Sequence, residues 1–371
     1  MQHVTIGPNQ AGQRLDKFLH KYLPEAPNSF LYKMLRKKNI TLNGRKAEGK
    51  EMLSPGDEVK LFFSDETFSK FSGGASSGCR ESAASGGKTA ASGSQDTKVS
   101  RPAAARLAET CRTAFSRLNG IAVLYEDEHV LILNKPAGIL TQKAEDADLS
   151  LNEWMIGYLL DTGAISEVEL HTFRPSVCNR LDRNTSGLVL CGKSLAGSQE
   201  LARVIRERSV RKFYRTVALG TITRPCRIEG WLVKDEVSNK VTVTSKNRGI
   251  PDASYIQTAY TPLQNISLTG RRQNCDFTYL EVELVTGKPH QIRAHLSGTG
   301  HPLLGDYKYG RKEINDVYKA QYHLNSQLLH AYRLEFPQLE GALAGLSGKN
   351  VTAPLPELFL KILERLERGK D

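Results

Sequence analysis

The sequence has no apolar run of about 18 residues, the length that a membrane-spanning helix needs. Its first residues, MQHVTIGPNQAGQRLDKFL, contain no apolar core like that of a secretory signal peptide. We therefore expect a cytoplasmic protein that has no membrane partner.

Motifs for metals and cofactors are also missing. The six cysteines form no CxxC pair and no Cys/His cluster with the spacing of a zinc site. The sequence contains neither a glycine-rich phosphate loop nor a nicotinamide-binding motif. We interpret the cysteines as reduced thiols that pack like small apolar groups, and we expect no metal and no cofactor.

Positive charge is in excess. The 371 residues include 51 Lys and Arg against 40 Asp and Glu, which gives a net charge of +11. Soluble proteins this basic often bind a polyanion, and nucleic acid is the usual one. A well-solvated surface gives the same total, so the positions of the cations have to decide between the two interpretations.

Composition divides the chain into three parts. Residues 1–65 and 118–371 have the apolar patterning of folded domains, whereas 66–117 include FSGGASSGCRESAASGGKTAASGSQDTK. A segment so rich in Ser, Gly and Ala buries too little apolar surface to offset the entropy lost on ordering. The sequence predicts a small N-terminal domain, a flexible linker over 66–117 and a large C-terminal domain.

The first part mixes helical and strand patterns. RLDKFLHKYL (14–23) and NSFLYKMLRKKN (28–39) have helical spacing, and Asn28 or Ser29 is the expected N-cap of the second helix. ITLNG and SPGDEVKLFF predict strands that begin or end at turns. Six cations with no acid among them are expected to face RNA phosphates: Lys33, Arg36, Lys37, Lys38, Arg45 and Lys46.

The large part has no regular alternation of strand and helix. Strand patterns at 130–133, 188–192 and 211–220 are interspersed with helical patterns at 151–160 and 193–210. A doubly wound parallel sheet would need regular βαβ units. The sequence therefore predicts an α+β fold.

The decapeptide NRLDRNTSGL (179–188) sets one carboxylate, Asp182, between Arg180 and Arg183. The two guanidinium groups would favour the ionised form of the carboxylate, which a nucleophile requires. Side chains of the following Asn-Thr-Ser turn would brace it through bonds to the backbone. A salt-bridge cluster at a turn has the same local pattern, so the decapeptide alone leaves both interpretations open.

Four stretches occur together: HTFRPSVCNRLDRNTSGLVL, RKFYRTVALG, LVTGKPHQIRAHL and GHPLLGDYKYG. Over about 118–340 they resemble the RluA-type family of pseudouridine synthases, and about 12–63 resemble the RNA-binding module of ribosomal protein S4. The resemblance implies a mixed, largely antiparallel sheet in the large domain and a small α+β S4-type domain before it. Asn179 stands where the family usually has His, and GKPHQ where it often has GRTHQ.

The resemblance also implies an activity: an isomerase that converts uridine in RNA to pseudouridine without a cofactor. It implies Asp182 as the nucleophile, Arg293 as the cation paired with it and Tyr214 as the ring packed against the target base. The Tyr214 hydroxyl would also help to remove a proton from the base. Arg180 and Arg183 would contact RNA, whose target base has to leave its stack.

Other residues of these motifs are assigned to structure. His290 and His295 do not share a helical face, so we interpret them as partly buried histidines and not as metal ligands. His301, Asp306 and Tyr307 are interpreted as loop scaffolding.

Large-subunit ribosomal RNA is the substrate that the resemblance favours, and transfer RNA is the alternative. A non-catalytic RNA-binding or ribosome-assembly factor would present the same basic face. A hydrolase built on Asp182 would need a second acid or base, which no recognisable motif supplies. We expect a monomer whose partner is RNA.

Overall fold

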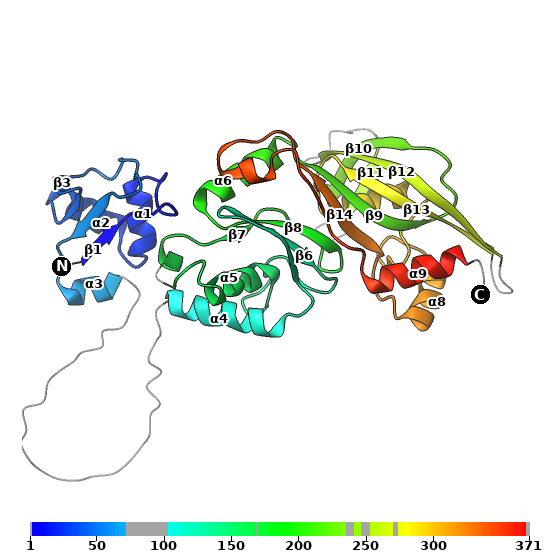
Figure 1. Ribbon diagram of the computed structural model, residues 1–371, viewed down its shortest axis with the longest axis horizontal. Coiled ribbons are helices and arrows are strands. Elements are labelled where there is room, and N and C mark those ends of the chain that lie inside the picture. The colour runs from blue at the N-terminus through cyan, green and yellow to red at the C-terminus, as the bar shows by residue number, and fades with distance from the viewer. Residues whose placement is uncertain are drawn as a thin grey trace, which may run out of the picture. The chain divides into compact units, whose positions relative to one another are not determined.

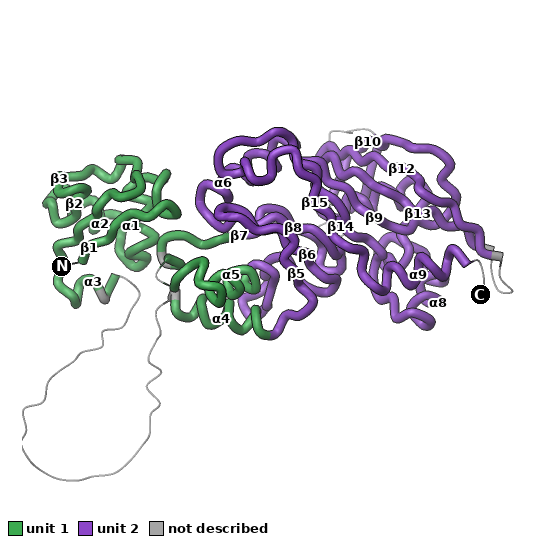
Figure 2. The backbone as a smooth tube through the Cα atoms, in the orientation of Figure 1, with its two compact units in different colours: residues 1–116, 153–175 green, residues 117–152, 176–371 purple. Residues whose placement is uncertain are grey.

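The computed structural model describes residues 2–71, 103–167, 169–234, 241–245, 253–269 and 274–368. The chain divides into two compact units, shown in separate colours in Figure 2. Unit 1 comprises residues 1–116 and 153–175, and unit 2 comprises 117–152 and 176–371. Among the described helices, none combines the length and the apolar character that crossing a bilayer requires.

Unit 1 contains a four-stranded antiparallel sheet in the order β1-β4-β2-β3. Its strands are β1 (Gln2–Thr5), β2 (Ile40–Leu42), β3 (Arg45–Lys46) and β4 (Glu58–Leu61). Helices α1 (Leu15–Tyr22) and α2 (Asn28–Arg36) bury Leu15, Phe18, Leu19, Leu31 and Leu35 in the core that includes the sheet residues Ile40, Val59 and Leu61. This arrangement agrees with the small α+β S4-type domain that the sequence predicts.

The predicted N-cap of α2 is wrong. Pro27 occupies that position, with no side-chain cap bond, and Asn28 is already the first helical residue. The proline ring fixes φ near the value that a helix entrance needs, −60° here, so the chain enters the helix without a polar cap.

The described ends of segment 66–117 are helical, as α3 (Asp65–Phe71) and α4 (Ala103–Arg117). In α4, Ala108, Cys111 and Ala114 are buried, a spacing typical of one helix face. Helix α5 (Leu151–Asp161) packs on α4: the ring centroids of Phe115 and Trp154 are 5.4 Å apart. The expected flexible linker otherwise covers residues 72–102, which lie outside the described residues.

Unit 2 is built on an eleven-stranded sheet, drawn in Figure 1. The path runs β11-β10-β12-β13-β9-β14-β8-β6-β5, with β15 paired to β14 and β7 paired to β8. Among the described strand pairs, β8 with β14 is the one parallel pair, so the sheet is mixed and largely antiparallel as the resemblance implies. The strands are β5 (Ala122–Glu126), β6 (Val130–Lys135), β7 (Ser176–Val177), β8 (Ser186–Gly192), β9 (Arg211–Leu219), β10 (Cys226–Lys234), β11 (Val241–Thr244), β12 (Ser254–Thr269), β13 (Asn274–Leu284), β14 (Leu329–Glu335) and β15 (Asn350–Thr352).

Helices cover this sheet in two places. Helices α8 (Lys312–Tyr322) and α9 (Glu357–Glu367) lie beside β9, β12 and β13 in Figure 1. Tyr318 of α8 packs on Phe277 of β13, and Phe359 of α9 packs on Tyr279 of the same strand. Helix α6 (Leu195–Arg206) places Leu201 and Val204 in the core that includes β6 and β8. Helix α7 (Gln291–Gly298) and the short 3-10 helices η1 (Glu169–His171) and η2 (Gly341–Leu346) complete the described elements.

The parallel contact between β8 and β14 depends on Gly187. Its φ of +111° lies in a region that L-residues rarely adopt, and a Cβ built there would overlap the backbone of Ala331, its partner in the ladder. The next residue pair is joined by side chains, with Ser186 Oγ and His330 Nδ1 2.8 Å apart. This contact fixes the end of the loop that carries Asp182.

Candidate active site

A pocket of about 780 Å³ opens in unit 2, a volume ordinary for a ligand site. It is lined by the loop before β8, the N-terminal part of β9, the segment from β13 into α7, and residues 140–144. The lining brings together Asp182, Tyr214 and Arg293, which lie far apart in the sequence. The three residues singled out by the resemblance therefore share one cavity.

The loop between β7 and β8 holds Asp182 in place through its backbone. On one side, Thr141 Oγ1 accepts from Leu181 N at 3.1 Å and donates to Leu181 O at 2.8 Å. On the other side, Gly138 N donates to Arg183 O at 2.9 Å. Thr185 N donates to Asp182 O at 3.0 Å and closes the turn. The position of the carboxylate is thus set by bonds on both sides of it.

The turn residues after Asp182 bond differently from the prediction. The Thr185 hydroxyl accepts from Gln327 Nε2 at 3.3 Å, and the Ser186 hydroxyl lies 2.8 Å from His330 Nδ1. The expected local bonds to the backbone are replaced because β14 packs directly beside this turn. Asn179, the departure from the family pattern, bridges β8: its Oδ1 accepts from Leu190 N at 2.7 Å.

Arg293 links two carboxylates. Its Nη1 donates to Asp182 Oδ2 at 3.0 Å, while Nε and Nη2 donate to Asp306 Oδ2 and Oδ1 at 2.7 and 2.9 Å. Burial works against the charge of Arg293, but the bonds to Asp306 and Asp182 outweigh it and raise the pKa of the guanidinium. Arg293 is therefore a permanent cation that is held rigidly against Asp182.

The flanking arginines do not pair with Asp182, contrary to the sequence interpretation. Arg183 turns away, and its Nε donates to Gly138 O at 3.0 Å. Arg180 is exposed and lines the pocket. In the described part of the chain, the groups in ion-pair range of Asp182 are Arg293 and, at 3.8 Å, His290 Nε2. Successive residues of a loop point in different directions, so adjacency in sequence did not give contact.

Asp306 is the functional residue that sequence reasoning missed. Its side chain is fully buried and also accepts from the backbone N–H groups of Lys308 and Tyr309, at 2.9 and 3.1 Å. The predicted role of Asp306 as loop scaffolding accounts for these bonds to the backbone. It does not account for the two bonds that Asp306 accepts from Arg293. An acid in the motif after HQIRAHL is the signal that could have indicated a partner for the arginine.

Alternation along β9 sends neighbouring rings to different surroundings. Tyr214 lines the pocket, whereas Phe213 lies beneath two cations, with Arg333 Cζ 4.2 Å and Arg211 Cζ 4.8 Å from its ring centroid. Burial, and to a smaller degree the charge of Asp182, raise the pKa of the Tyr214 hydroxyl. The hydroxyl is therefore protonated at neutral pH.

The two histidines near Arg293 have different partners. His290 adopts a left-handed φ of +54° at the start of α7, and its Nδ1 lies 2.9 Å from the Tyr309 hydroxyl. His295 Nδ1 lies 2.9 Å from Thr258 Oγ1 in the interior. Burial lowers the pKa of both rings, and the charge of Asp182 partly offsets this for His290.

A buried lysine, Lys135, bonds to the backbone of the Asp182 loop and of the segment after β6. Lys135 Nζ donates to the carbonyl oxygens of Pro136, Ile139 and Arg183 at 3.1, 2.9 and 3.0 Å. Burial lowers the pKa of Lys135 to about 7, although the charge of Asp182 opposes the shift.

The charges around the pocket are strongly one-sided. Among its lining residues in the described chain, Asp182 is the one acid. The lining includes six Lys and Arg residues: Lys143, Arg180, Arg208, Lys212, Lys288 and Arg293. A cavity with this balance attracts an anionic ligand and presents a single carboxylate to it.

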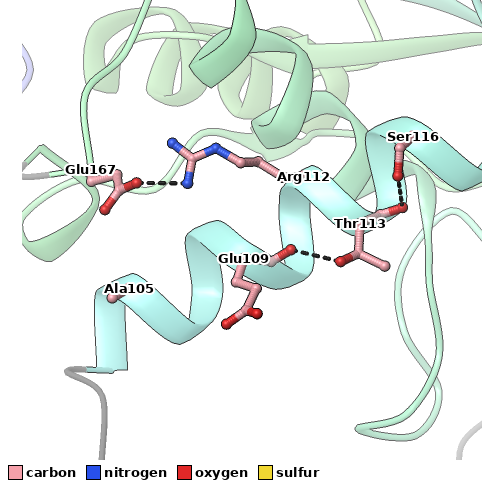
Figure 3. Close-up of a pocket in the computed structure, with 6 residues that line it drawn as sticks. All are labelled: Ala105, Glu109, Arg112, Thr113, Ser116 and Glu167. Carbon is pink, nitrogen blue, oxygen red and sulfur yellow. Dashed lines mark hydrogen bonds and ion pairs between the residues drawn. The ribbon is translucent and has the colours of Figure 1, made fainter.

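A second hollow, shown in Figure 3, lies in unit 1 along α4 and is lined by Ala105, Glu109, Arg112, Thr113, Ser116 and Glu167. Arg112 Nη1 forms an ion pair with Glu167 at 2.6 Å. The Thr113 and Ser116 hydroxyls donate to carbonyl oxygens of their own helix. Because these side chains already bond to one another or to their own helix, we take the Asp182 pocket as the candidate active site.

The six cations predicted to face RNA are all exposed in unit 1: Lys33, Arg36, Lys37, Lys38, Arg45 and Lys46. Within the part of the chain that the structure describes, none of them has a carboxylate in ion-pair range. They remain available to phosphate groups.

Comparison with known proteins identifies the family. The profile of a family described as RNA pseudouridylate synthase matches residues 129–298, the part that holds Asp182, Tyr214 and Arg293. The chain is 30% identical over 255 residues to the ribosomal large subunit pseudouridine synthase D of Zymomonas mobilis, which covers 66% of this chain and 73% of that protein. The chain belongs to the RluA-type family of RNA pseudouridine synthases.

Other pseudouridine synthases match over a longer span. The ribosomal large subunit pseudouridine synthase C of Vibrio vulnificus is 27% identical over 383 residues, which covers 100% of this chain and 98% of that protein. The solved structure of Human RNA Pseudouridylate Synthase Domain Containing 4 has a TM-score of 0.52 and 21% identity, and covers 71% of this chain and 98% of that chain. The predicted fold class and the predicted isomerase activity are confirmed.

Proposed function

We propose that this pseudouridine synthase acts on uridine in large-subunit ribosomal RNA, and that Asp182 is its nucleophile. The observation that carries the proposal is the braced carboxylate that stands alone among the pocket's cations, bonded to Arg293 at 3.0 Å. The substrate class is supported by the names of the relatives from Vibrio and Zymomonas.

Nucleophilic attack on uridine requires an ionised carboxylate that the substrate can reach. The Asp182 side chain is 26% exposed, so it opens to the pocket while Arg293 holds one of its oxygens. Attack on the sugar or on the base would carry the nucleotide through a covalent intermediate. The N1–C1′ bond of the uridine breaks, the C5–C1′ bond forms, and the proton on C5 is exchanged for one on N1.

Tyr214 is proposed to pack against the flipped base. The aromatic face offers the stacking that helps to offset a flipping cost of a few kcal/mol. Because its pKa is raised, its hydroxyl is suited to hydrogen bonding and poorly suited to accept the C5 proton at neutral pH. We therefore assign Tyr214 to base positioning.

The N-terminal S4-type domain, residues 1–65, is proposed to bind RNA through its six exposed cations. Segment 66–117 joins it to the catalytic domain, residues 118–371. A joined module raises the effective concentration of RNA near the pocket without any new contact to the target base. Arg180 and Arg183 are proposed to contact the RNA beside the target.

The test is tritium release from RNA labelled at uracil C5, because isomerisation frees that hydrogen. Transcripts of large-subunit ribosomal RNA should release tritium and transfer RNA should not. Asp182→Asn should abolish release and keep RNA binding, while Asp276→Asn, an exposed acid of β13 outside the pocket, should leave the rate unchanged. Release from transfer RNA alone would refute the substrate, and full turnover by Asp182→Asn would refute the nucleophile.

A further inference from the structure

We propose that Arg208 and Lys212 form a binding site for a phosphate group of the RNA strand next to the target uridine. The proposal rests on the proposed function, because it places that strand across the Asp182 pocket. It adds two contacts to which the sequence analysis assigned no role, although Lys212 lies in the stretch RKFYRTVALG.

Both cations reach the pocket from one short segment. Arg208 follows the C-cap Glu207 of α6 and Lys212 is the second residue of β9, and both line the cavity that holds Asp182. The Lys212 ammonium extends toward the segment between β13 and α7, since a Cβ built on Gly287 would lie 3.9 Å from Nζ. The two side chains therefore place positive charge on the pocket wall.

These two cations lack the partners that their neighbours have. On the same helix, Arg203 binds Glu200 at 2.9 Å and Glu207 at 2.7 Å. On the same strand, Arg211 binds Glu283 and Glu335, each at 2.9 Å. No carboxylate of the described residues lies within ion-pair range of Arg208 or Lys212.

The residue type at position 208 is itself informative. Arg208 has a φ of +59° and occupies the position after the C-cap Glu207 in a Schellman motif. The two bonds of that motif run from Arg208 N to Ile205 O and from Ser209 N to Val204 O, at 3.2 and 3.0 Å. Glycine is the residue that favours this left-handed position. The phosphate site would give the Arg208 side chain a role that offsets this unfavourable backbone conformation.

The surroundings of Lys212 in the described chain indicate that the site lacks a negative charge. Burial, and then the charge of Arg208, lower the pKa of its ammonium group. A bound phosphate would offset both effects, since its oxygens accept charge-assisted bonds from the two cations. An RNA strand supplies such a group at every nucleotide, and the neighbouring Asp182 places the strand at this pocket.

The test measures binding of a fragment of large-subunit ribosomal RNA in an Asp182→Asn background, so that no reaction occurs. Arg208→Gly and Lys212→Met should each raise the Kd about tenfold, the effect of one charge-assisted bond. Each should reduce the slope of log K against log salt by about 0.7, the loss of one phosphate contact on a single strand. Arg203→Gln, a cation of α6 that is already paired, should change neither value.

Arg208→Gly separates binding from folding. Glycine suits the left-handed backbone at this position, so this variant should keep or raise the Tm while it loses affinity. A loss of affinity without a loss of stability cannot come from misfolding.

Neutral methylphosphonate linkages then locate the phosphate. One such linkage beside the target uridine should raise the Kd of the parent protein about tenfold and have little further effect on Arg208→Gly. Competition with inorganic phosphate tests whether the site binds a free anion in place of RNA. If phosphate binds through these residues while Arg208→Gly and Lys212→Met leave the RNA Kd unchanged, the proposal is overturned.

Unchanged Kd and salt slope in both variants would also overturn the phosphate site, even with normal tritium release by the wild-type enzyme. Absent tritium release from every RNA, with the Kd effects present, would instead refute the proposed reaction and support the phosphate site. The two failures are therefore distinguishable.

Discussion

Replacing Asp306 with Asn should damage both stability and catalysis, because this residue anchors the arginine that holds Asp182. The Asp306 side chain is fully buried and Arg293 is 9% exposed, so the ion pair is shielded from water. The substitution keeps the shape but removes the charge, and it turns an amide donor toward the donors of the guanidinium. Breaking a buried pair from one side costs about 3–5 kcal/mol.

Catalysis should fall as well, since Arg293 would no longer be fixed against Asp182 Oδ2 at 3.0 Å. A misplacement of about 1 Å in catalytic geometry costs about 100-fold in rate, so a loss of up to that size is expected. Urea unfolding gives the stability change, and tritium release gives the rate. Asp316→Asn, an exposed acid that accepts from the Tyr307 hydroxyl at 3.1 Å, is the matched control and should cost less than about 1 kcal/mol.

A double variant tests the cause. Adding Arg293→Met to Asp306→Asn removes the uncompensated buried cation, so part of the lost stability should return while the rate of tritium release does not recover. If Asp306→Asn lost under about 1 kcal/mol and kept the wild-type rate, the reasoning about a buried anchor would be refuted.

Three further predictions concern other parts of the chain. Gly187→Ala should lower the free energy of unfolding in urea by at least about 3 kcal/mol, because the added Cβ would overlap the Ala331 backbone. Gly138→Ala, with φ +92° but open space around its Cβ, should lower it by about 1–2 kcal/mol. Equal losses would contradict the close-approach argument. Burial lowers the pKa of His330 to about 4, so the unfolded chain takes up a proton at higher pH than the folded one. Stability should therefore fall by about 3 kcal/mol as the pH drops from about 6.5 to about 4, and a pH series of unfolding curves should lose this slope in His330→Gln. Reversing the charge of Lys37 and Lys38 to Glu should raise the KM for RNA at low salt with kcat and Tm unchanged; an unchanged KM would exclude this face from RNA binding.

The sequence predicted the fold class and which stretches would form the pocket. Periodicity located α1, α2, α5 and α6 and strands such as β8, because apolar spacing reports which face is buried. The resemblance placed Asp182, Tyr214 and Arg293 in one site, and one cavity holds them.

The sequence could not predict which way each side chain points, and so which charged groups pair. Arg180 and Arg183 adjoin Asp182 in the chain yet form no pair with it, while Asp306 controls Arg293 from a separate loop. Arg208 lies outside the quoted motifs and Lys212 had no assigned role within RKFYRTVALG, so both became notable only when the structure showed which neighbouring cations already pair with acids. Partner choice of this kind is decided by tertiary packing, which local pattern does not encode.

The parallel pairing of β8 with β14 has a consequence for the timing of synthesis. Ser186 and His330 are 144 positions apart, so the loop bearing Asp182 stays incomplete until the ribosome has made nearly all of the chain. Joining such distant segments is also slow, because a long loop has to close before the contact forms. The N-terminal sheet, whose partners are all within the first 61 residues, can fold well before that. A nascent chain would thus complete its basic N-terminal module first and the loop that carries Asp182 last.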